Sequence, residues 1–258
     1  MATTHNGYSP ALIEACVDNT ATALAAQRLG VGRIELCADL VEGGITPSAG
    51  MIEVCRRELE LPIFVIIRPR GGDFCYEPAE FQAMQHDIRW ARAAGVQGIV
   101  AGIVRPDGTI DAERTRELID LARPLEFTFH RAFDRTRDPF EALDTLIGLG
   151  VDRVLTSGQA ATAWDGVDLL TRLVAHARGR IGILPGGGVT RETIRAILAR
   201  TGAREIHVRA SGWRDSPMQF RNPRVELGGL GDGHEHRLPA IDSPRLQACV
   251  AALRGELK

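Results

Sequence analysis

An α/β fold, a single (β/α)8 TIM barrel, is predicted by three observations. Short runs of aliphatic residues alternate with longer amphipathic segments from end to end, a pattern typical of parallel strands joined by helical crossovers. One helix-to-strand connector, a glycine followed by a small aliphatic residue and then a strand, recurs at Gly30, Gly95, Gly150 and Gly202. The length of 258 residues suits one such barrel. We therefore expect one domain over residues 1–258.

The elements follow from hydrophobic periodicity in order along the chain. Strands are expected at 12–17, 33–38, 62–69, 98–104, 126–133, 153–158, 181–186 and 205–211. Helices are expected at 19–29, 48–58, 78–94, 111–122, 138–149, 165–178, 190–200 and 243–256. Capping signals support two helix starts, because Asp138-Pro139 and Ser243-Pro244 each place a capping residue before a proline. Glycine just past a helix closes its last turn in the left-handed conformation.

One connection is long. Residues 212–242 are rich in Gly, Arg and Pro and separate the eighth strand from the last helix; we expect a loop there that acts as a lid, a subunit contact or a flap. Its His234-Glu235-His236 run invites a metal-binding interpretation. Alternating residues in a glycine-rich loop are more often solvent-exposed, so exposure is the preferred interpretation.

Composition narrows the function classes. The formal net charge is -2 with both signs mixed, which argues against a nucleic-acid partner. Aliphatic runs fall short of the roughly 18 residues needed to cross a bilayer, and the first residues lack a signal pattern. We expect a cytoplasmic protein with no membrane partner.

The numbers and positions of cysteine and lysine exclude further classes of function. The five cysteines are odd in number and form no Cys-x-x-Cys pair, which argues against a disulfide framework and a structural zinc site. Of the 31 basic residues, the only lysine is Lys258. A Schiff-base mechanism needs a buried lysine, so a lysine-dependent aldolase is excluded. No organic cofactor is implied.

Carboxylates and thiols alternate on the first two predicted strands. Glu14 and Cys16 share one face of the first strand, and Glu35 and Cys37 share one face of the second. Because the other face must pack against apolar helices, these four side chains should point into the barrel. We expect Glu14 beside Glu35 and Cys16 beside Cys37.

The other strand ends carry cations, a histidine and glycines. Active sites of such barrels lie at the C-terminal ends of the strands, and the candidate catalytic residues there are Glu35, Arg68, His130 and Arg209. Consecutive glycines after the seventh strand allow backbone N–H groups to approach an anion. The candidate substrate or anion-binding residues are Arg70, Arg131, Ser157, Gly186, Gly187, Gly188 and Ser211.

Several runs together resemble the CutC copper-homeostasis family. They are Arg33-Ile34-Glu35-Leu36-Cys37-Ala38, Glu42-Gly43-Gly44-Ile45-Thr46-Pro47-Ser48, Val65-Ile66-Ile67-Arg68-Pro69-Arg70-Gly71-Gly72-Asp73-Phe74, Thr128-Phe129-His130-Arg131-Ala132-Phe133-Asp134, Val154-Leu155-Thr156-Ser157-Gly158 and Leu184-Pro185-Gly186-Gly187-Gly188. The resemblance implies a (β/α)8 barrel and an association with copper. Cys16 and Cys37 correspond to the family's strand cysteines, and soft thiolates suit Cu(I).

Three interpretations remain open from the sequence. The first is copper binding at Cys16 and Cys37. The second is an isomerase, lyase or hydrolase acting on a small anionic or phosphorylated substrate, with Glu35 or His130 as general base and acid; a variant of it holds a hard divalent ion through Glu14, Glu35, His130 and His207. The third is a non-catalytic scaffold. A homo-oligomer, a dimer or tetramer, is expected in each case.

Overall fold

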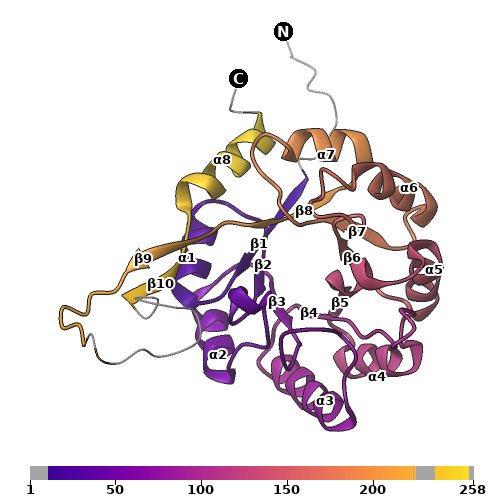
Figure 1. Ribbon diagram of the computed structural model, residues 1–258, viewed down its shortest axis with the longest axis horizontal. Coiled ribbons are helices and arrows are strands. Elements are labelled where there is room, and N and C mark those ends of the chain that lie inside the picture. The colour runs from indigo at the N-terminus through magenta and orange to yellow at the C-terminus, as the bar shows by residue number, and fades with distance from the viewer. Residues whose placement is uncertain (1–10, 223, 225–235, 256–258) are drawn as a thin grey trace.

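The computed structural model describes residues 11–222, 224 and 236–255. Their parallel strands form a central barrel, and the helices surround it as an outer ring (Figure 1). The strand order is β7-β6-β5-β4-β3-β2-β1-β8, and the two ends of this order, β7 and β8, lie side by side. The predicted TIM-barrel fold is confirmed.

Each predicted strand and helix is present. The barrel strands are β1 Leu12–Val17, β2 Arg33–Leu36, β3 Ile63–Ile66, β4 Gly98–Ala101, β5 Glu126–Phe129, β6 Arg153–Thr156, β7 Gly182–Pro185 and β8 Glu205–Arg209. The helices are α1 Thr20–Arg28, α2 Ala49–Glu58, α3 Pro78–Ala93, α4 Ala112–Ala122, α5 Pro139–Leu149, α6 Val167–Ala177, α7 Ile194–Thr201 and α8 Ser243–Arg254, with 3-10 turns η1 Leu40–Glu42 and η2 Arg131–Arg135. Six of the eight strands end two to four residues earlier than predicted.

One of the two predicted helix caps is confirmed, at α5, whereas α8 is capped by Asp242 and Ser243 is its first helical residue. The backbone N–H groups of Phe140 and Glu141 donate to the Asp138 side chain at 2.8 and 3.1 Å, which satisfies free donors at the start of α5. Gly150 ends the same helix with φ of 74°, the left-handed conformation that glycine tolerates best. The chain then turns directly into β6.

The long connection differs from the predicted loop. Its two arms pair as an antiparallel hairpin, β9 Ser211–Asp215 with β10 Arg237–Ile241. The hairpin extends from the ring on the side of α1 and α2 (Figure 1). Composition rich in glycine and proline indicated a loop, but extended backbone satisfies its N–H and C=O groups by pairing. The metal-binding interpretation of residues 234–236 falls outside the described residues, apart from His236.

Two separate apolar cores support the barrel. The larger lies between the strands and the helix ring. The smaller lies inside the barrel, where Phe64, Ile66 and Val100 pack with Cys37 and Leu40. None of the described helices combines the length and the apolar character needed to cross a membrane. The interior core supports the polar side chains at the strand ends.

Candidate functional site

Ion pairs fill the barrel at the N-terminal ends of the strands. The Arg33 guanidinium donates to Glu14 and, at 2.6 Å, to Glu205, and Arg153 donates to Glu205 at 2.9 Å. Both guanidinium groups stack on the Phe64 ring, with Cζ atoms 4.7 and 5.1 Å from its centroid. These four charged residues and Phe64 form what we call the barrel floor. Glu14 is fully buried in it.

The strand register corrects one expectation. Glu14 lies opposite Arg33, and Cys16 lies opposite Glu35, so Glu14 is not placed directly beside Glu35. Neighbouring strands of a barrel are staggered, and the stagger shifts β2 by one inward-facing position relative to β1. Glu14 therefore belongs to the barrel floor, whereas Glu35 lies one level nearer the C-terminal strand ends.

The two predicted cysteines meet at the next level. The Sγ atoms of Cys16 and Cys37 are 3.6 Å apart, as expected from the alternation on the two strands. One carboxylate oxygen of Glu35 joins them, and the three ligand atoms all lie within 4.8 Å of one another. Gly44 packs over Cys37, because a Cβ atom there would lie 3.2 Å from its Sγ. This thiol pair, Cys16 and Cys37, is half-buried to buried.

Hydrogen bonding polarises the thiol pair. The hydrogen bond from Cys37 lowers the pKa of Cys16 to about 5, and the same interaction raises the pKa of Cys37 well above its usual range. Burial, together with the negative charge on Cys16, raises the pKa of Glu35. Burial opposes the charge on His207, but hydrogen bonds to Cys16 and Glu14 raise its pKa well above 6.5. Negative charge thus concentrates on Cys16, beside a protonated imidazole.

His207 connects the thiol level to the barrel floor. Its Nδ1 lies 2.8 Å from Glu14 Oε1, and its Nε2 lies 3.8 Å from Glu35 Oε2. Burial opposes ionisation of Glu14, yet His207 and Arg33 lower the pKa of this carboxyl to about 2. The sequence suggested His207 only as a metal ligand for a hard cation. Among the described residues, the metal-like cluster consists of Cys16, Glu35 and Cys37, without the histidines.

Two predicted catalytic residues, Arg68 and His130, follow β3 and β5. Arg68, just after β3, donates to the carbonyl oxygens of Glu42, Gly44 and Gly72 at 2.8 to 3.0 Å. It therefore fixes the β2–α2 loop that covers the thiol pair. His130, just after β5, is buried. Burial and the nearby Arg68 charge lower its pKa to about 3, which keeps the imidazole neutral.

The glycine run after β7, predicted from the sequence as an anion site, lies against the Arg131 guanidinium. Gly187 and Gly188 have φ values of 102° and 64°. A Cβ atom on Gly187 would lie 3.2 Å from Arg131 Nη1 and 3.3 Å from Ser157 Cβ. Arg131 is held there by Asp134 at 2.7 Å and by the Ser157 hydroxyl at 2.8 Å. We call this group the glycine cradle; it consists of Gly187, Gly188, Arg131 and Ser157.

The remaining candidates are engaged elsewhere. Arg70 pairs with Glu80 at 2.6 Å and Asp73 at 3.1 Å, on the α3 side of the β3 loop. Arg209 is exposed and donates to the Ser211 hydroxyl at 2.9 Å. Gly186 packs against His207, whose Cβ lies 2.9 Å from the position of an added Cβ. Gly186 therefore borders the thiol level through His207, whereas Arg70, Arg209 and Ser211 do not join it.

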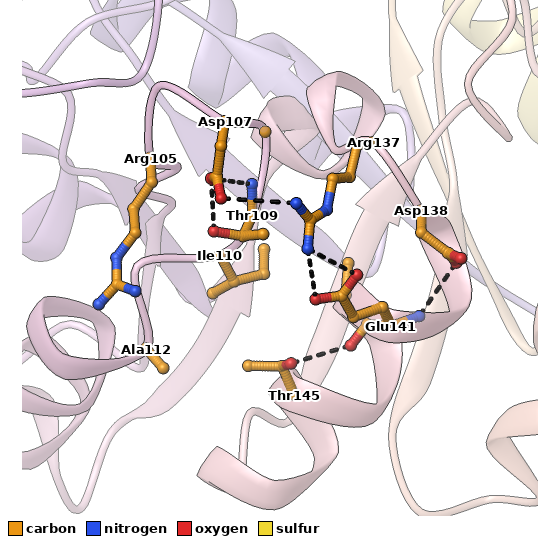
Figure 2. Close-up of a pocket in the computed structure, with 11 residues that line it drawn as sticks. Arg105, Asp107, Thr109, Ile110, Ala112, Arg137, Asp138, Glu141 and Thr145 are labelled. Atoms are coloured by element: carbon orange, nitrogen blue, oxygen red, sulfur yellow. Dashed lines mark hydrogen bonds and ion pairs between the residues drawn. The ribbon is translucent and has the colours of Figure 1, made fainter.

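A cavity of about 270 Å³ lies away from the barrel axis, beside the start of α5. Figure 2 shows Arg137 between Asp107 and Glu141, which its guanidinium approaches to 3.5 and 3.2 Å. Arg105 on the opposite wall lies 3.7 Å from Asp111. Because each arginine already has a carboxylate partner, the cavity is a surface ion-pair cluster. The strand ends remain the stronger candidate site.

Comparison with known proteins gives a consistent picture. The model of the CutC family matches residues 11–212. A mouse (Mus musculus) protein named copper homeostasis protein cutC homolog is 45% identical, over 98% of this chain and 92% of its own length. The human (Homo sapiens) homolog is 44% identical, over 98% and 91%. A CutC crystal structure from Streptococcus agalactiae, 33% identical, superposes with a TM-score of 0.74 over 76% of this chain and 97% of that chain.

Proposed function

The chain belongs to the CutC family, and on that premise we propose that it serves copper homeostasis by binding Cu(I) between Cys16 and Cys37. The observation that carries the proposal is the 3.6 Å separation of the two sulfur atoms. Metal–sulfur bonds in proteins are about 2.3 Å long for zinc, so two sulfurs at this separation can both reach one ion. Cu(I) favours such soft ligands.

The residues around the thiol pair support metal capture. Glu35 supplies a third donor within reach of both sulfurs. His207 contacts Glu14 and lies beside Glu35, so it fixes the side chains below the pair. Gly44, held by Arg68 through its carbonyl, gives Cys37 room. Copper here is the cargo of the protein, and these residues hold and release it.

Anaerobic Cu(I) titration against a competing chelator tests the proposal. The Cys16→Ser/Cys37→Ser protein should bind Cu(I) more than about 100-fold more weakly than wild type, because changes outside the ligand set typically cost only 10- to 100-fold. Cys55→Ser is the matched control, since Cys55 is a buried thiol whose Sγ contacts Thr20 instead. Equal Cu(I) affinity of the double variant and wild type would refute the thiol site.

A second candidate function, catalysis on a small anionic substrate, is favoured by one observation. The pKa of Glu35 is raised while that of Cys16 is lowered, and groups with pKa values pushed apart commonly serve as acid and base. The glycine cradle would hold the anionic group. Arg131 Nη1 and the N–H groups of Gly187 and Gly188 have no acceptor among the described residues.

Inorganic phosphate binding tests the cradle. Arg131→Met should weaken phosphate binding roughly 10- to 100-fold, because a charge-assisted hydrogen bond contributes about 1.5–3 kcal/mol. Arg70→Met is the control: it removes an arginine in the loop after β3, whose partners are Glu80 and Asp73. Calorimetry measures both. Unchanged phosphate affinity in Arg131→Met would exclude the cradle as an anion site.

A further inference from the structure

Three buried polar atoms near the ends of β3 and β5 have no hydrogen-bond partner within the described part of the chain. They are Arg68 Nε, the Tyr76 hydroxyl and His130 Nε2. Their residues are only 6%, 5% and 4% exposed. A buried polar group left without a partner costs about 1–3 kcal/mol. Three in one region point to a ligand that supplies what the protein does not.

The charge on Arg68 is also uncompensated. Its Nη atoms donate to backbone carbonyl oxygens of Glu42, Gly44 and Gly72. No described Asp or Glu forms an ion pair with it, whereas the other buried arginines, Arg33 and Arg153, pair with carboxylates. A buried cation without an anion is strongly destabilising. The missing partner of Arg68 should therefore be negatively charged.

His130 contributes a donor rather than an acceptor. The Ala132 backbone N–H donates to His130 Nδ1 at 3.2 Å, so Nδ1 carries no proton. The imidazole is neutral because burial and Arg68 lower its pKa to about 3. A neutral imidazole with an unprotonated Nδ1 must carry its proton on Nε2. The atom without a partner is thus an N–H group.

The Phe74 ring brings two of the donors together, and Tyr76 lies near Arg68. Phe74 lies under the Arg68 guanidinium at 5.0 Å and against the His130 ring at 4.9 Å. Burial raises the pKa of Tyr76 to about 12, although the charges of Arg68 and Arg70 and the polar contact with Arg68 lower it. A guanidinium can only donate, so the Tyr76 O–H group stays protonated and is itself a donor without an acceptor. Gly102 gives His130 room, because a Cβ atom there would lie 2.6 Å from Nδ1. Phe74 itself is half-buried, so this region reaches the barrel mouth.

We propose that Arg68, Tyr76 and His130 bind the carboxylate group of a small organic acid. The Nε edge of a guanidinium matches the two oxygens of a carboxylate in a planar, paired geometry. The Tyr76 hydroxyl and the His130 Nε2–H group add donors of the kind a carboxylate accepts. The proposal does not depend on copper, since none of the three residues contributes a ligand to the thiol pair.

Nitrogen-15 histidine NMR on the full chain, titrated with acetate and pyruvate, tests the proposal. We expect the His130 signals to report an Nε2–H tautomer and to shift as either acid binds. Tyr76→Phe removes only the hydroxyl and should weaken acetate binding roughly tenfold. His130→Gln provides a second variant with the same expected direction. Equal melting temperatures would show that the variants remain folded.

Thr115→Val is the matched control, because Thr115 also has a buried hydroxyl without a partner among the described residues. It should leave acetate affinity unchanged, and Tyr76→Phe should leave Cu(I) affinity unchanged. Because Cu(I) affinity and acetate affinity are measured separately, the experiment distinguishes a failure of copper binding from a failure of carboxylate binding. No shift with either acid would overturn the proposal, and so would an equal shift with inorganic phosphate, which would indicate a site for any anion.

Discussion

Replacing Arg33 with methionine should lower the free energy of unfolding by about 3–5 kcal/mol, the largest stability change expected from a single residue of the barrel floor. Arg33 is 4% exposed and donates to both Glu14 and Glu205. Methionine keeps much of the side-chain volume, but it leaves the fully buried Glu14 carboxylate with His207 alone. Removing one partner of a buried ion pair lowers the free energy of unfolding by more than the intact pair contributes to it, because the remaining charge stays buried without a partner. Urea denaturation measures the change.

Arg57→Met is the control for this substitution. Arg57 is 72% exposed on α2 and pairs only with its neighbour Glu58. Exposed ion pairs contribute between about 0 and 1 kcal/mol, so the control should stay within that range. An Arg33→Met protein as stable as the control would show that the barrel floor tolerates an unpaired carboxylate.

Acid should destabilise the protein through His130. Its pKa is about 3 in the folded protein, below the 6.5 of an exposed histidine. Between these values the unfolded chain binds a proton that the folded chain excludes, so stability falls as pH drops from about 6.5 towards 3. The slope contributed by this one group approaches about 1.4 kcal/mol per pH unit. Unfolding free energies measured across that range should show it.

Comparison with variants isolates the contribution of His130. His130→Gln should remove most of its share of the slope, even though the carboxyl of Glu14, with a pKa of about 2, adds acid sensitivity of its own below pH 4.5. Parallel pH profiles of wild type and His130→Gln would contradict a buried neutral imidazole.

The fold could be predicted because its signals are local. Helix caps such as Asp138 and the glycine connector at Gly150 act within a few residues, so the sequence specifies them directly. The hairpin at 211–215 and 237–241 could not be predicted in this way. Its strands pair across more than twenty residues, and neither arm has strong strand periodicity of its own.

The candidate site could be predicted in its residue types and only partly in its contacts. Alternation on β1 and β2 placed Cys16 and Cys37 on inward faces, and they do meet. The stagger between strands, which pairs Cys16 with Glu35 in register, is a property of the closed barrel and leaves no mark in one strand. The partners of Arg68 are backbone carbonyls, which carry no sequence signal. Tyr76 gave no signal because it follows the strand by ten residues.

The barrel floor limits the routes by which a molecule or ion can reach the thiol pair. Arg33, Phe64 and Arg153 occupy the barrel axis below the thiol pair and are nearly sealed from solvent. A molecule or ion that reaches Cys16 and Cys37 from the C-terminal strand ends cannot pass on through the barrel, because the barrel floor blocks the path below them. If Cys16 and Cys37 bind Cu(I) as proposed, copper must enter and leave at the C-terminal strand ends, so a copper donor and a copper acceptor would have to bind the same face of the protein in turn.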